Sequence, residues 1–340
     1  MLSRTMFRIP SVGGWVLVAA SLSVHLAGCG GSEPQPAASP EPPPLDDDQG
    51  GPTAAAPPSN AKVKEGMDAI QAGDFARAKA ALDEAVQKNP KDAQAVFYLG
   101  VADEGLGDEK SATEQYRHAL ELDPKLVEAS ANLSGVLLDQ NDAAGALSAA
   151  ENGLKVAPQN ASLLRNRAVA LEQTGSKDAV AAFKAAAAAA PNDKEVQYLY
   201  AEALAASGDA AGATAALKPL VDTDDLAVLA SAGRLLGKLK DYDDCVAALD
   251  KAIAKKDDPE LRVQRGICRH GKKDAKGAEA DFEAAIAANP KFAPAHYYLG
   301  EDKRARGDKK GAKAELQKAV ELDPSGPVGA AAKKALSELK

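Results

Sequence analysis

The sequence is poor in the side chains that usually build catalytic or metal centres. Its 340 residues include four histidines, three cysteines and one tryptophan, and aromatic residues make up only 4% of the chain. His118, His270 and His296 are scattered, and no i, i+4 histidine pair is present to bind zinc. We expect each of the three on a helix surface, and we predict no metal site.

Motifs for phosphate binding and nucleophilic catalysis are also missing. The glycines follow a regular spacing instead of forming a phosphate-binding loop, and no serine stands in a recognisable arrangement with a histidine and an acid. Acidic pairs such as Asp243-Asp244 are explained by helix starts and ends. The sequence therefore predicts that the protein is not an enzyme and takes no cofactor.

The chain has no excess of positive charge. Its formal net charge is −8 at pH 7, and residues 30–58 carry five negative charges and no positive one. The rest of the chain is nearly balanced, which gives no support to a basic nucleic-acid-binding face. We predict no nucleic-acid partner.

A spacing of about 34 residues organises most of what is present. Small residues and a proline recur together, first as Gly66, Ala78, Ala85 and Pro90 and then as Gly100, Ala112, Ala119 and Pro124. Two late copies keep the same spacing: Gly266, Ala278, Ala285 and Pro290, then Gly300, Ala312, Ala319 and Pro324. With the poorer copies between them there are eight units, which indicates a repeat array.

Each unit contains two apolar patterns of helical period. They are separated by a break such as Ala72-Gly73-Asp74, where Gly ends one helix and Asp caps the next. Proline ends the second helix, and the small residues let the two helices approach closely. With no alternating β-branched runs, the chain is predicted to be all-α.

These residues resemble the tetratricopeptide repeat (TPR) family over residues 59–326. Phe75, Phe183, Tyr242 and Phe282 supply its usual bulky fillers. The resemblance implies an α-solenoid of about eight helix-turn-helix units. Two departures stand out: no aromatic occupies the usual early position of any first helix, and Lys218-Pro219 interrupts the second helix of the fifth unit, where we expect irregular packing. Residues 327–340 are predicted to form a C-terminal capping helix.

Residues 1–28 resemble a bacterial lipoprotein signal peptide. Arg4 and Arg8 precede an apolar run that ends in Leu26-Ala27-Gly28-Cys29. The resemblance implies cleavage before Cys29, lipidation of that cysteine with palmitate and other acyl chains, and a place in the cell envelope. Gly30, where an Asp would retain the protein at the inner membrane, points to the outer membrane. The alternative is an uncleaved membrane helix, for which the run is short.

Residues 29–58 join this lipidated cysteine to the repeats. The segment is rich in proline, alanine and acidic residues, and few large apolar groups are present to offset the entropy of ordering. We predict a disordered tether that holds the array away from lipid.

Cys245 and Cys268 lie in consecutive units. In an oxidising compartment an even pair could form a disulfide. Both, however, occupy positions that are small or apolar in other units, so two buried free thiols are the simpler interpretation.

The resemblance implies that a partner binds the face lined by the first helix of each unit. Pairs at i, i+4 trace this face. The candidate peptide groove consists of Val63, Met67, Phe97, Val101, Asn132, Arg165, Asn166 and Tyr198. The two asparagines could bond a peptide backbone, or they could be ordinary surface residues.

The predicted function is a membrane-anchored protein-protein interaction scaffold in the bacterial cell envelope. Its partner would be a cell-envelope protein or a peptide segment of one. The alternatives are a pilotin-like or secretion-assembly lipoprotein, a polysaccharide-export scaffold, and an enzyme whose site only folding assembles.

Overall fold

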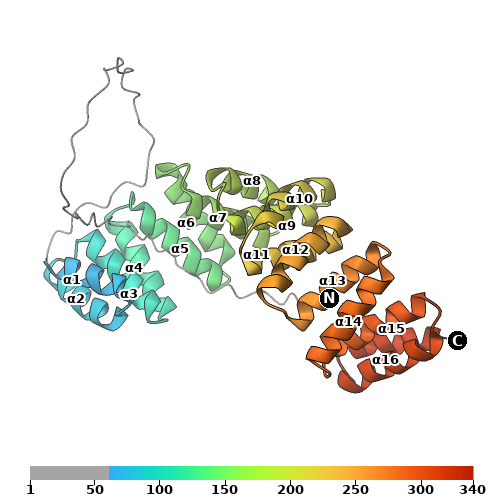
Figure 1. Cartoon of the computed structure of the whole chain (residues 1–340). Coiled ribbons are helices and arrows are strands. Elements are labelled where there is room, and N and C mark those ends of the chain that lie inside the picture. Colours follow the sequence, from blue (N-terminus) through green and yellow to red (C-terminus); the bar gives the residue numbers. More distant parts are fainter. Residues whose placement is uncertain (1–60, 340) are drawn as a thin grey trace, which may run out of the picture. The chain divides into compact units, whose positions relative to one another are not determined.

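The computed structural model describes residues 61–339, which contain seventeen α-helices, one 3₁₀ helix and no strand (Figure 1). The predicted all-α repeat fold is confirmed. The predicted signal peptide, Cys29 and the tether fall outside the described residues. No helix in the described range is long and apolar enough to cross a membrane.

The chain forms two compact units that divide after Val136, within α5. The first unit contains α1 (Ala61–Gln71), α2 (Phe75–Lys88), α3 (Ala93–Gly105), α4 (Glu109–Leu122) and most of α5 (Val127–Asp139). Here α1 packs on α2, α2 on α3 and α3 on α4, while α1 also contacts α3. Contacts between successive helix pairs are those expected of stacked repeats.

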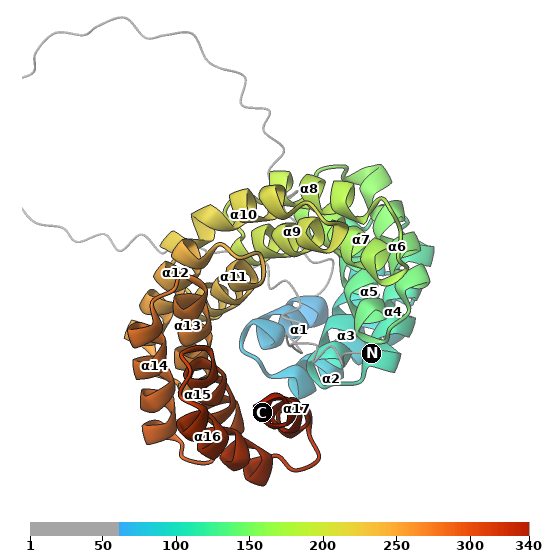
Figure 2. The ribbon, with the colours of Figure 1, turned by 90° about the vertical axis from the view of Figure 1, so that its right-hand side faces the viewer.

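The second compact unit begins at Leu137 and holds the remaining helices. These are α6 (Ala143–Val156), α7 (Ala161–Gln173), α8 (Ala179–Ala189), α9 (Lys194–Ser207), α10 (Ala210–Leu217), α11 (Leu226–Lys238), α12 (Tyr242–Lys255), α13 (Pro259–Gly271), α14 (Ala275–Ala288), α15 (Ala293–Ala305), α16 (Lys309–Leu322) and α17 (Pro327–Glu338). First helices contact one another along this unit, α9 with α11, α11 with α13 and α13 with α15. Figure 2 shows α9, α11 and α13 in one layer and α10, α12 and α14 in the other.

The turn inside each helix pair is built from a residue with positive φ followed by an aspartate or serine. Gly73, Gly107 and Gly307 have φ values of 74°, 79° and 83°. The following aspartate caps the second helix: Asp74 accepts from the N–H of Arg77 at 3.1 Å, and Asp308 accepts from Gly311 at 2.9 Å. Each cap satisfies a backbone donor that the helix start leaves without a partner.

In seven of the eight helix pairs that the structure describes, the core forms where a large side chain of the second helix meets a small residue of the first; the pair of α5 and α6 has Ala150 instead. Leu82, Tyr116, Phe183, Leu217, Leu249, Phe282 and Leu316 occupy this equivalent position, and each is at most 1% exposed. A Cβ added to Gly100 would lie 2.7 Å from the Tyr116 ring, and one added to Gly266 would lie 2.5 Å from the Phe282 ring. The small residues of the repeat are therefore required by close helix packing.

The fifth helix pair departs from this plan where the sequence predicts it. Pro219 lacks a backbone N–H, and α10 ends at Leu217 in a 3₁₀ helix over Lys218–Asp222. Leu220 and Val221 are buried, and the 3₁₀ helix contacts α9, α11 and α12. The interruption therefore still contributes to the core.

Candidate functional site

The apolar part of the predicted groove lies in the first compact unit and is mostly core. Val63 is 0% exposed and belongs to a cluster with Leu82 and Leu99. Phe97 is 7% exposed, with its ring centroid 5.0 Å from that of Tyr98 and 5.8 Å from that of Tyr116. The prediction that Val63 and Phe97 line an open groove is therefore wrong, because both fill space between helices.

Met67 and Val101 are half-buried and pack against the same cluster. Both side chains therefore contribute to the core of this unit and keep part of their surface exposed.

The side chain of Asn132 in α5 forms a hydrogen bond within the chain. Its amide donates to the Tyr116 hydroxyl at 3.2 Å, and that hydroxyl donates to Glu104 of α3 at 2.6 Å. Burial, with the nearby Glu104 charge, raises the pKa of Tyr116 well above its usual range. This chain of hydrogen bonds satisfies a fully buried hydroxyl, and the sequence analysis did not foresee it. A tyrosine among leucines and phenylalanines at a core position was its only signal.

The remaining predicted groove residues lie in the second compact unit. Asn166 is buried, at 4% exposure, while Arg165 of α7 and Tyr198 of α9 are half-buried. The Tyr198 ring packs against the core formed by α9, α11 and α12. Burial raises its pKa to about 12; the charge of Glu202 adds to the rise and Arg234 of α11 opposes it.

Tyr198, Glu202 and Arg234 therefore form a polar patch across α9 and α11. Three successive first helices each carry a buried side-chain atom that lacks a hydrogen-bond partner among the described residues: Arg234 Nε on α11, Gln264 Oε1 on α13 and Glu301 Oε1 on α15. Asp103 Oδ2 on α3 and Asp302 Oδ2 on α15 also lack one. Leaving buried polar atoms unpaired is costly, so their recurrence on three successive first helices requires an explanation. We call Tyr198, Glu202, Arg234, Gln264 and Glu301 the polar strip.

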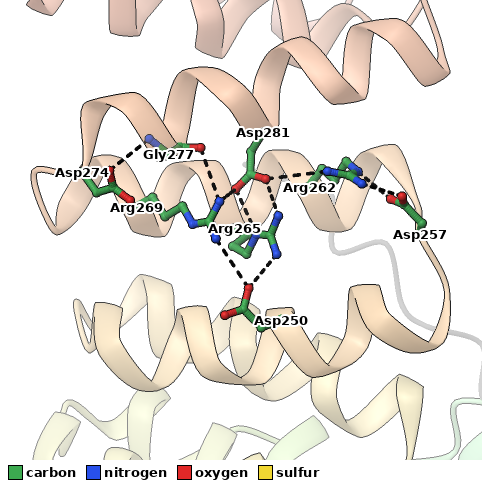
Figure 3. Close-up of polar contacts among 8 residues, drawn as sticks. All are labelled: Asp250, Asp257, Arg262, Arg265, Arg269, Asp274, Gly277 and Asp281. Carbon is green, nitrogen blue, oxygen red and sulfur yellow. Dashed lines mark hydrogen bonds and ion pairs between the residues drawn. The ribbon is translucent and has the colours of Figure 1, made fainter.

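A second polar cluster joins α12, α13 and α14, and its charged side chains pair with one another. Asp281 of α14 is 1% exposed and accepts from Arg265 at 3.0 Å and from Arg269 at 3.0 Å (Figure 3). Arg265 also donates to Asp250 of α12 at 2.6 Å, and its hydrogen bond to Asp281 raises its pKa. The arginines point at acids in the same chain, so this cluster is structural.

The expectation that all three histidines lie on helix surfaces is wrong for His296. It is 7% exposed, and its Nδ1 lies 2.8 Å from Glu315 of α16 while its Nε2 lies 3.1 Å from the carbonyl oxygen of Pro290. His270 is about half-exposed and pairs with the buried Asp302 at 2.9 Å. Within residues 61–339, no group of three or more histidines, cysteines and acids could hold a metal ion.

Cys245 of α12 and Cys268 of α13 form a disulfide with Cα atoms 6.3 Å apart. Both are buried, as the sequence analysis expects, but the structure shows a bond instead of the two free thiols that it favours. Gly237 of α11 leaves room for the pair, because a Cβ there would lie 2.9 Å from the Cys268 sulfur. Adjacent small positions of consecutive units thus come within bonding distance.

Comparison with protein families gives the same repeat. A family model described as tetratricopeptide repeat matches residues 63–126, 136–179, 231–291 and 271–327. The chain belongs to the tetratricopeptide repeat family. No curated protein matches the sequence significantly.

Several solved structures resemble this TPR chain. The MamA protein is 18% identical, with 53% of this chain and 93% of that one covered and a TM-score of 0.43. Yeast Tom70 is 18% identical, with 84% and 65% covered and a TM-score of 0.47. A tetratricopeptide repeat protein from Parabacteroides merdae is 17% identical, with 82% and 97% covered and a TM-score of 0.38.

Proposed function

We propose that this TPR protein is a lipid-anchored scaffold of the bacterial cell envelope that binds a segment of another envelope protein along the polar strip. The observation that carries the binding role is the set of buried polar atoms without partners on α11, α13 and α15. An extended peptide carries backbone donors and acceptors at regular intervals, which could pair with Arg234, Gln264 and Glu301.

Two features support the envelope location. The amino-terminal sequence resembles a lipoprotein signal that ends at Cys29. The Cys245–Cys268 disulfide is of a kind that persists in oxidising compartments such as the periplasm and is rare in the bacterial cytosol. Anchoring would raise the local concentration of the scaffold beside envelope partners.

Site-specific photocrosslinking in cells tests the binding role. A crosslinker at Glu202, exposed on first helix α9, should capture a discrete envelope protein, whereas one at Glu283, exposed on second helix α14, should not. The additional change Arg234→Glu should abolish capture from position 202 without unfolding the protein. Equal capture from both positions would reject the polar strip as the binding surface.

The anchor is tested separately by mass and labelling. Cleavage before Cys29 removes the chain's single tryptophan, Trp15, so the mature protein should lack tryptophan fluorescence and carry added acyl mass. Cys29→Ala should abolish both palmitate labelling and detergent-phase partitioning. A wild-type protein that keeps its starting methionine and no acyl groups would refute anchoring.

A further inference from the structure

The last three helix pairs carry a lysine-rich edge that the sequence analysis did not foresee. Residues 226–340, which begin with α11, contain 23 lysines and arginines against 18 aspartates and glutamates, although the whole chain is acidic. Because helices in a stacked array alternate in direction, the α11–α12, α13–α14 and α15–α16 turns lie on one side. We call these three turns and their flanking residues the turn edge. Its exposed lysines include Lys238, Lys240, Lys273, Lys276, Lys310 and Lys313.

Two of these lysines hold an unfavourable backbone conformation. At the positive-φ position of the turns, five helix pairs use glycine and a sixth uses Asn141, residues that tolerate this region. Lys240 and Lys273 occupy the same position in consecutive pairs with φ values of 64° and 65°. A Cβ-bearing chain is strained there, and such strain persists mainly where the side chain serves a purpose.

That purpose is not an ion pair inside the described chain. The ammonium groups of Lys240 and Lys273 are exposed and have no ion-pair or hydrogen-bond partner among residues 61–339. Neighbouring Lys272, in contrast, pairs with Asp243. The strained lysines thus present free positive charge to solvent.

The turn edge is also hollowed beside Lys240. An open depression of about 740 Å³ lies between α10, the α11–α12 turn and the end of α13. Lys240, Lys272, Asp241 and Asp243 line it, and Leu239, Tyr242 and Thr214 contribute to its wall. Asp243 pairs with Lys272, and Asp241 accepts from the backbone N–H of Asp244 at the start of α12, so Lys240 is the cation of this lining that has no partner among the described residues. An unpaired lysine beside an apolar wall suits a segment with both acidic and apolar side chains. A flat layer of lipid headgroups could contact the lysines but would leave the apolar wall uncovered.

We propose that the turn edge is a docking surface for an acidic peptide segment of a protein partner, with Lys240 and Lys273 as its principal contacts. The acidic side chains would pair with the exposed lysines, and an apolar neighbour would enter the hollow. The inference rests on the proposed scaffold function but concerns a surface separate from the polar strip.

Binding of a fluorescein-labelled octaglutamate peptide to the purified protein, followed by anisotropy at low salt, tests the proposal. We expect measurable binding that 0.5 M NaCl abolishes. Lys240→Gln with Lys273→Gln should weaken it at least tenfold, whereas the matched control Lys291→Gln with Lys334→Gln, away from the turn edge, should change it less than twofold. Equal affinity of both double variants would overturn the proposal.

Replacing both lysines with glycine distinguishes a role in binding from a role in stability. Lys240→Gly with Lys273→Gly relieves the positive-φ strain while removing the charges, so the melting temperature should rise as binding is lost. A fall in melting temperature with unchanged binding would show that the lysines are structural and would also overturn the proposal. Binding to vesicles of phosphatidylglycerol and phosphatidylcholine, with none to the peptide, would replace the protein partner by a lipid surface. None of these measurements depends on the anchor or on the polar strip, so their failure leaves the proposed function to its own tests.

Discussion

Arg265 in α13 donates to both carboxylate oxygens of Asp281 in α14, which is the most buried acid of the ionic cluster between these helices. Asp281→Asn would leave three arginines around a neutral amide. We expect unfolding to become easier by about 3 kcal/mol, because breaking a buried pair leaves charge uncompensated. Urea denaturation measures this. Asp250→Asn is the control: that side chain is 48% exposed, and its loss should cost less than about 1 kcal/mol.

The disulfide should be both detectable and stabilising. Unfolded, unreduced protein should show two thiols fewer than reduced protein. Replacing Cys245 and Cys268 with alanine should lower stability by about 3 kcal/mol, because the bridge closes a loop of 23 residues in the unfolded chain. Equal thiol counts before and after reduction would restore the interpretation as free thiols.

Because the repeat glycines pack closely against large side chains, a larger residue at such a glycine should destabilise the protein, and a smaller partner side chain should restore part of the stability. Gly266→Ala places a methyl group against the Phe282 ring and should destabilise the protein by about 1–2 kcal/mol, since overpacking outweighs the better helix propensity of alanine. Phe282→Leu should recover part of this loss in the double variant, although it is destabilising alone. A simple sum of the two single effects would argue against direct contact.

Tyr198 should lose its proton at a higher pH than an ordinary tyrosine. Its pKa of about 12 in the folded protein lies above the ordinary value of 10.0, so its stabilising effect is complete below about pH 10 and is lost as the pH rises toward 12. Absorbance titration near 295 nm should show tyrosines that ionise late, and Tyr198→Phe should reduce their number by one. Glu202→Gln should lower this pKa, because the Glu202 charge helps to raise it.

The repeat periodicity predicted most of the fold. Glycine, aspartate and proline positions set the helix ends, and Pro219 marked the irregular fifth pair, because these residues act locally. Burial was harder to predict. Val63 and Phe97 occupy first-helix positions that are half-buried in most other units, and only the packing of their own neighbours places them in the core.

Pairing between helices was also beyond the sequence analysis. The basic stripe of Arg262, Arg265 and Arg269 is visible at helical spacing, but its acids come from α12, α14 and the Asp257 loop (Figure 3). His296 likewise depends on Glu315, nineteen residues away. The strain at Lys240 and Lys273 was missed because lysine in a turn is ordinary until its φ angle is known.

The disulfide between α12 and α13 also limits how far the chain can be extended when it is pulled. When the chain is pulled from its two ends, helix pairs can peel away one after another, but the loop from Cys245 to Cys268 stays closed while its sulfurs remain bonded. Full extension of the oxidised chain should fall short of that of the reduced chain by about 80 Å, the contour length of 23 residues. An optical-tweezers record would therefore reveal the redox state of a single molecule.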